Sequence, residues 1–169
     1  FGRGGTFLAT EIERIMSRMT DVMLFAGENV KFDCLSKGIK HQTYSYVVMP
    51  GVEITPKKKR TGNKVTIGWL ARFAKVKRPD RVLEIAKELP ELNFVLGGDG
   101  PLRPEMQIDA PKNCKFLGWI DPKDFWSQVD VALLTSENEA LPISLIEAQL
   151  CGLPSVSTPA GSAPEVVIN

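Results

Sequence analysis

Two glutamates near the C-terminal end, Glu139 and Glu147, are the residues best suited to bind a polar ligand. The segment between them predicts a helix over 142–151, with Pro142 at its first position and an expected core stripe of Ile143, Ile146 and Leu150. Glu147 follows Ile143 by four residues, so it should lie on this same apolar face. A carboxylate on a buried face costs several kcal/mol unless it is paired. We therefore interpret Glu147 as a ligand-binding residue, with a structural ion pair to Arg72 as the alternative.

Glu139 lies just before the predicted start of that helix, where free backbone N–H groups favour anions. A second loop, residues 71–79, carries four cations: Arg72, Lys75, Lys77 and Arg78. Ligands of parallel sheets bind beyond the carboxyl ends of the strands, which is where this loop is expected. Arg72 and Lys77 beside a helix N-terminus would bind a diphosphate. An exposed basic loop without a ligand is the alternative.

A glycine-rich segment, residues 97–101, follows another predicted strand. Gly98 and Gly100 allow positive φ and close approach of a ligand. The segment lacks the third glycine of the dinucleotide-binding fingerprint. Taken alone, it is equally compatible with a tight turn that binds nothing.

The motifs of metal and nucleophilic chemistry are missing from the sequence. No Asp-x-Asp pair occurs, and the single histidine, His41, has neither zinc ligands nor a nucleophilic partner nearby in sequence. The cysteines, Cys34, Cys114 and Cys151, form no CxxC pair and are typical of reduced, mostly buried thiols in a cytosolic protein. We expect no metal and no cofactor.

The elements that must position these residues alternate regularly from residue 64 onward. Strands are predicted at 64–70, 93–96, 114–117, 129–135 and 154–158, and helices at 79–89, 103–108, from 121, at 142–151 and from 161. The helix at 79–89 should bury Val82, Ile85, Ala86 and Leu89, and Asp121 should cap the helix that Pro122 begins. The strands are too apolar to face water on either side. The pattern indicates an α/β fold, a Rossmann-like parallel sheet with helices on both faces.

The first fifty residues predict a smaller unit. It contains a helix over 10–19 with Ile12, Ile15, Met16 and Met19 at helical spacing, a buried strand at 21–26, a helix over 28–37 ended by Gly38, and a strand at 44–49. Residues 51–63 predict a linker, because most of them are polar, basic or punctuated by Pro and Gly. The cations at 57–60 are interpreted as a solvated loop, with an anion-binding patch as the alternative.

Composition limits the classes of function. The chain has 169 residues, 43% of them hydrophobic, with 21 basic and 20 acidic residues, so nothing directs it to nucleic acid or to a membrane surface. No segment approaches the roughly 20 apolar residues of a membrane span. The N-terminus has neither an initiator methionine nor a signal peptide, and the sequence ends just after a turn. We expect a piece of a larger protein, truncated at both ends.

Five blocks in order over residues 64–169 resemble the donor-binding domain of retaining glycosyltransferases of the two-Rossmann GT-B architecture, the group that includes glycogen and sucrose synthases. The blocks are Arg72 with Lys77, then 98–101, 116–120, 139–156 and 161–165. A weaker likeness covers residues 11–52. It implies that residues 1–50 are the tail of an acceptor domain, 51–63 a linker, and 64–169 the nucleotide-sugar-binding domain.

The resemblance also implies roles. Arg72 and Lys77 would neutralise the leaving diphosphate without a metal, and Glu139 would contact the sugar; these are the expected catalytic residues. Glu147 would hold the ribose, and the other donor-binding residues would be Gly98, Asp99, Gly100, Gly118, Trp119, Ile120, Ala140, Leu141, Pro142 and Ile143. Ala140 stands where the family usually has glycine, so its methyl group would crowd the sugar or select a smaller one. Transfer would retain the anomeric configuration through same-face attack.

The partners implied are a UDP- or GDP-type nucleotide sugar and a saccharide or lipid-linked acceptor, in polysaccharide biosynthesis in the cytoplasm. Nucleic acid is not expected, and peripheral membrane contact of the intact enzyme is allowed. Alternatives are an isolated sugar-nucleotide-binding module without transfer activity, an epimerase or phosphorylase, and a remnant without a ligand. The paired glutamates disfavour an epimerase. A phosphorylase would usually need a cofactor lysine, and none can be identified in the sequence. Apolar residues at 10–50 should pack on the main domain or swap with a second copy.

Overall fold

The computed structural model describes residues 3–39, 44–54 and 64–167. Its contacts divide the chain into two compact units, an N-terminal unit (Phe1–Gly51) and a C-terminal unit (Val52–Asn169). Residues 55–63, most of the predicted linker, lie outside the described residues, and so does His41.

The C-terminal unit is built on a parallel five-stranded sheet with the order β5-β4-β3-β6-β7. The strands are β3 (Thr66–Leu70), β4 (Asn93–Gly97), β5 (Cys114–Gly118), β6 (Val131–Leu134) and β7 (Ser155–Ser157). The chain runs outward from β3 to β5 and then returns to β6 on the other side of β3. Leu70, Gly97 and Gly118 lie in register across three strands, so the loops that follow them open on one edge of the sheet. A ligand site is expected at the carboxyl edge beside this reversal of strand order.

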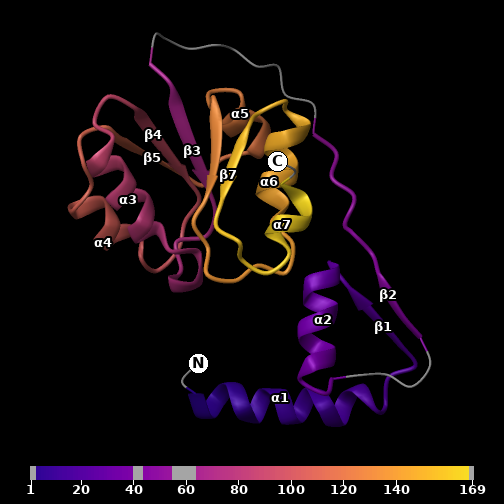
Figure 1. Cartoon of the computed structure of the whole chain (residues 1–169). Coiled ribbons are helices and arrows are strands. Elements are labelled where there is room, and N and C mark those ends of the chain that lie inside the picture. The colour runs from indigo at the N-terminus through magenta and orange to yellow at the C-terminus, as the bar shows by residue number, and fades with distance from the viewer. Residues whose placement is uncertain (1–2, 40–43, 55–63, 168–169) are drawn as a thin grey trace. The chain divides into compact units, whose positions relative to one another are not determined.

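Helices cover both faces of this sheet, as the sequence predicts. They are α3 (Pro79–Glu88), α4 (Arg103–Ile108), α5 (Pro122–Trp126), α6 (Ile143–Leu150) and α7 (Ala163–Val166), with a short 3-10 helix, η1 (Lys75–Lys77). Figure 1 shows α3 and α4 on one side of the strands and α6 and α7 on the other. Neighbouring residues of one strand enter opposite cores: Leu133 of β6 packs with α3, whereas Ala132 and Leu134 pack with α5 and α6. The doubly covered parallel sheet is therefore confirmed.

Helix boundaries in the C-terminal unit are close to the predictions, but two predicted core stripes are wrong in part. In α3, Leu83 is buried and Leu89 is exposed. In α6, Ile143 and Leu150 are exposed and the buried residues are Leu145 and Ala148. The predicted stripe lay two positions away, which on a helix is roughly the opposite face. Pro142, predicted as the first helical residue, is the N-cap of α6, which begins one residue later at Ile143. In the N-terminal unit the helix predicted over 10–19 is observed over Arg3–Ser17.

The Asp121 cap is confirmed, because its side chain accepts the N–H of Lys123 at 2.8 Å. Cys34, Cys114 and Cys151 are free thiols that are half-buried, which is less than predicted. Burial raises the pKa of Cys114 to about 11. Among the described helices, none has both the length and the apolar character that crossing a membrane requires.

The N-terminal unit consists of α1 (Arg3–Ser17), β1 (Val22–Phe25), α2 (Glu28–Ser36) and β2 (Tyr44–Val47), with β1 and β2 paired in parallel. Gly38, at φ +76°, ends α2, and the N–H of Ile39 reaches back to the carbonyl of Cys34. The predicted burial of β1 is wrong within this unit, since only Phe25 of its residues is buried. The apolar residues predicted at helical spacing, Ile12, Ile15, Met16 and Met19, are also exposed.

Candidate functional site

A cavity of about 640 Å³ lies at the carboxyl edge of the C-terminal sheet. We call it the Glu147 cavity. It is lined by the residues that follow β3, β4 and β5 and by the first turns of α5 and α6: Leu70, Ala71, Arg72, Gly98, Asp99, Gly100, Trp119, Ile120, Pro122, Ile143, Ser144 and Glu147. Three loops and helix α6, far apart in the sequence, thus contribute to one cavity.

The glycine loop of this cavity is held by close backbone contacts. Gly98 has φ +114°, and a Cβ there would lie 2.1 Å from the carbonyl oxygen of Ala71. The N–H of Phe73 donates to the carbonyl of Asp99 at 2.9 Å, and the N–H of Gly98 donates to the carbonyl of Gly118 at 2.7 Å. Packing therefore explains why glycine is needed, and the same packing places the loop on the cavity wall.

Glu147 is half-buried in this cavity without a cation beside it. Its Oε2 accepts one hydrogen bond, from Nε1 of Trp126 at 3.2 Å. Burial raises the pKa of the Glu147 carboxyl; the hydrogen bond from Trp126 lowers it, and the nearby charge of Asp121 raises it. Over residues 64–167 no basic side chain pairs with Glu147, so the alternative of an ion pair with Arg72 is not observed. Glu147 does lie on the same face of α6 as Ile143, but that face lines the cavity rather than the core.

Glu139 is buried and fully paired, which the sequence did not reveal. Nζ of Lys77 lies 2.6 Å from both carboxylate oxygens of Glu139, and Oγ of Ser136 donates to Oε1 at 2.6 Å. We call these three residues the Glu139 corner. Lys77 and Glu139 also line a smaller cavity of about 240 Å³, together with Leu70, Ala71, Arg72, Leu141, Pro142, Ile143 and Ser144. The two cavities share Arg72 and the first turn of α6.

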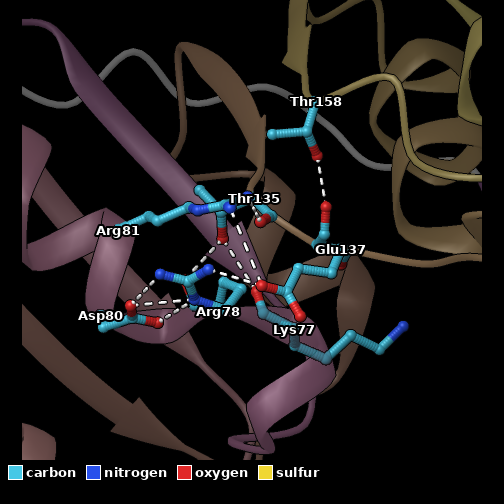
Figure 2. Close-up of polar contacts among 8 residues, drawn as sticks. Lys77, Arg78, Asp80, Arg81, Thr135, Glu137 and Thr158 are labelled. Atoms are coloured by element: carbon cyan, nitrogen blue, oxygen red, sulfur yellow. Dashed lines mark hydrogen bonds and ion pairs between the residues drawn. The ribbon is translucent and has the colours of Figure 1, made fainter. Parts of the chain in front are cut away.

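The loop that carries Lys77 is fixed by a network of polar contacts (Figure 2). The Thr135 hydroxyl lies 2.9 and 3.0 Å from the carbonyl oxygens of Lys77 and Arg78, to which it donates. Arg78, at φ +50°, pairs with Asp80 and Glu137, and these hydrogen bonds raise the pKa of its guanidinium. Arg78 is therefore a structural cation of the loop.

Arg72 differs from these paired cations. It is exposed, lines both cavities, and makes no side-chain hydrogen bond or ion pair with any other described residue. The α6 N-terminus beside it has no side-chain cap, and Ile143 and Ser144 of its first turn line both cavities. An unpaired guanidinium next to a free helix N-terminus can bind an anion.

The structure thus brings most of the predicted site residues to one edge of the sheet. Two of them line neither cavity: Gly118 is buried and supports the glycine loop, and Ala140 is exposed. Ser144 and Ser136 also belong to the site, although neither was predicted from the sequence. Ser144 could have been found as a first-turn residue of α6, but nothing in the sequence connects Ser136 to Glu139 in particular. In the described part of the chain, no three His, Cys, Asp or Glu side chains form a group that could hold a metal ion.

Residues 52–169 match the family model described as "Glycosyl transferases group 1". The chain is 39% identical over 113 residues to a Vi polysaccharide biosynthesis protein, VipC/TviE, of Salmonella typhi, covering 61% of this chain and 20% of that protein. It is 34% identical over 107 residues to N-acetyl-alpha-D-glucosaminyl L-malate synthase of Bacillus anthracis, covering 58% of this chain and 28% of that protein.

Two solved structures share the fold. Anabaena Alr3699/HepE, in complex with UDP and glucose, matches with a TM-score of 0.77 at 17% identity, over 95% of this chain and 50% of that one. Sucrose-phosphate synthase from Thermosynechococcus elongatus matches with a TM-score of 0.81 at 16% identity, over 94% of this chain and 46% of that one. The chain thus spans half or less of the length of each of these four proteins.

Proposed function

The chain belongs to the group 1 glycosyl transferases, and we propose that its C-terminal unit is the donor-binding domain of a retaining enzyme. The donor would be a nucleotide-diphosphate sugar and the acceptor a saccharide or a lipid-linked glycan. In this proposal residues 1–50 belong to the acceptor domain and 51–63 link the two. The main alternative is a module that binds a sugar nucleotide without transferring the sugar.

The observation that carries the proposal is Glu147, a half-buried carboxylate with one hydrogen bond and no ion pair to any other described residue. Burial without a charge partner is unfavourable unless a ligand supplies hydrogen bonds. The two neighbouring hydroxyls of a ribose can donate to the two oxygens of one carboxylate. The glycine loop also lines this cavity and leaves room for a flat base, since Gly98 and Gly100 carry no side chain.

The diphosphate would lie between Arg72, Lys77 and the first turn of α6. Arg72 makes no ion pair with any residue that the structure describes, and the α6 N-terminus is not capped by a side chain. These groups supply positive charge where the leaving diphosphate gains negative charge, so the proposal requires no metal ion. Fixed charges and dipoles of this kind lower the barrier most when they are already in place before the reaction.

In the proposed reaction the bond between the anomeric carbon and the diphosphate oxygen breaks first, and its electron pair stays on the diphosphate. The acceptor hydroxyl then attacks the anomeric carbon from the same face, and its proton passes to the leaving phosphate oxygen. Configuration is retained because both events occur on one face of the sugar. Glu139 would orient the sugar hydroxyls during this step.

Titration calorimetry with UDP, GDP and ADP tests the donor site. UDP is the first choice because the HepE structure contains UDP. We expect one nucleotide to bind and Glu147→Ala to weaken it at least tenfold, since a hydrogen-bonded charged group contributes about 1.5–3 kcal/mol. The proposal fails if no nucleotide binds, or if Glu147→Ala binds as tightly as the unaltered chain. Transfer of labelled sugar by this chain, compared with that by a longer form, separates an enzyme from a binding module.

A further inference from the structure

We propose that Ser136 is a positioning residue that holds Glu139 against the donor sugar when Lys77 turns to the diphosphate. This inference rests on the proposed function. It starts from a conflict visible at the Glu139 corner, where both oxygens of Glu139 are paired with the same ammonium that is needed for the diphosphate.

The conflict arises because Glu139 and the diphosphate are both negatively charged and would both attract the Lys77 ammonium. Lys77 lies 2.6 Å from each Glu139 oxygen, and its side chain is 26% exposed, so it reaches the smaller cavity as well. A bound diphosphate would carry more negative charge than one carboxylate and would draw the ammonium toward itself. Glu139, whose side chain is only 7% exposed, would then lose part of its counter-ion while still buried.

Ser136 is the side chain that still donates a hydrogen bond to Glu139 when Lys77 turns to the diphosphate. Its side chain is buried, its Oγ donates to Oε1 of Glu139 at 2.6 Å, and its carbonyl accepts the Thr158 hydroxyl at 2.7 Å. The Glu139 backbone is also fixed, since the Ser162 N–H approaches its carbonyl and a Cβ at Gly161 would lie 1.7 Å from that carbonyl. The side-chain torsions of Glu139 are thus its remaining freedom, and Ser136 restricts them independently of Lys77.

The assignment predicts a specific pattern of affinities. Without the Ser136 hydroxyl, the Glu139 side chain moves with Lys77 or rotates. The donor sugar then loses a correctly oriented hydrogen-bond acceptor, the Glu139 carboxylate. The Ser136 hydroxyl donates to Glu139 and not to the groups proposed to bind the nucleotide and phosphates, so the affinity for the nucleotide should change little. Ser136 would therefore affect the sugar part of donor binding and not the nucleotide part.

The test compares Ser136→Ala with Ser162→Ala. Both serines are buried, but Oγ of Ser162 has no hydrogen-bond partner in the described structure, so its removal controls for the loss of a buried hydroxyl. Calorimetry gives the dissociation constants of UDP and UDP-glucose, or of GDP and GDP-mannose if GDP is the nucleotide that binds. Melting temperatures establish that each variant is folded.

For Ser136→Ala we expect nucleotide affinity to stay within about twofold and the affinity for the sugar nucleotide to fall about tenfold, the loss typical of a hydrogen bond to a charged group. Ser162→Ala should change neither affinity, and Ser136→Thr, which keeps a hydroxyl, should recover the sugar nucleotide if it melts like the unaltered chain. Equal losses of both ligands in Ser136→Ala, or no loss of either, would overturn the assignment. If the unaltered chain binds no nucleotide at all, the proposed function has failed, and the inference falls with it.

Discussion

The Glu139 corner and the Glu147 cavity lie at one edge of the sheet but differ in how their carboxylates are buried and paired. At the corner, Glu139 is buried and has a lysine on both oxygens and a serine on one. In the cavity, Glu147 is half-buried and has a single hydrogen bond from an indole. Arg72, the cation shared by the two cavities, pairs with neither carboxylate.

The difference indicates which carboxylate is stable without a ligand and which one a ligand would stabilise. A buried carboxylate with a cation and a hydroxyl donor is stable without ligand, so its geometry exists before the donor arrives. A half-buried carboxylate with little hydrogen bonding is destabilised until a ligand donates to it. We therefore expect changes at the corner to affect the free energy of unfolding more than changes around the cavity do.

The largest expected effect comes from removing the cation of the corner. Lys77→Met leaves Glu139 charged and buried, and it should lower the free energy of unfolding by about 2–3 kcal/mol. Arg72→Met should change it by less than about 0.5 kcal/mol, because Arg72 is exposed and unpaired among the described residues. Urea denaturation at pH 7 measures both values.

A double variant tests whether the loss comes from the unpaired charge of Glu139. Glu139→Gln combined with Lys77→Met should recover most of the stability, since a neutral amide does not require a cation. If Lys77→Met and Arg72→Met lower the free energy of unfolding by similar amounts, the corner depends on its cation no more than the cavity does.

The second effect concerns binding and has an unusual sign. Glu139→Gln should raise the affinity for UDP by about three- to tenfold, because Lys77 is released from its carboxylate and a negative charge near the diphosphate is removed. Glu137→Gln is the matched control, since Glu137 pairs with Arg78 on the same loop and lines neither site cavity. Calorimetry should find less than a twofold change for the control. Weaker UDP binding by Glu139→Gln would mean that the carboxylate supports the phosphate site instead of competing with it.

Much of the fold was predictable because its signals are local. Apolar runs bounded by Gly and Pro located the five strands of the C-terminal sheet, and Asp121 with Pro122 located the start of α5. The orientation of α6 was wrong because Ile143 and Leu150 are as apolar as Leu145, and their positions alone do not show which face meets the sheet. In the N-terminal unit, Leu24 looked buried by composition, but no described residue covers it.

The site was predictable only as a set of loops. Parallel topology brings the segments after β3, β4 and β6 to one edge, so Arg72, the glycine loop and α6 could be expected together. The pairing of Lys77 with Glu139 joins residues 62 positions apart and depends on the exact rotation of η1, which Thr135 fixes from beneath. No sequence spacing encodes that contact, and the competing expectation, Arg72 with Glu147, was equally reasonable from charge alone.

The smallest expected effect is the pH dependence of Glu147, and it tests the cavity directly. Burial raises the pKa of this carboxyl above its ordinary 4.5, so the unfolded chain ionises first as pH rises. Ionised Glu147 therefore destabilises the fold: the penalty grows as pH rises from 4.5 to the raised pKa, is complete above that pKa, and disappears as pH falls below 4.5. Glu147→Gln should melt slightly higher than the unaltered chain at pH 7 and equally at pH 4, a difference of at most about 1 kcal/mol because the side chain is partly exposed. Saturating UDP should reverse the order at pH 7, since only the carboxylate accepts two ribose hydroxyls. If Glu147→Gln instead melts lower than the unaltered chain without ligand, Glu147 is a stabilised structural residue, and the contrast with the Glu139 corner is lost.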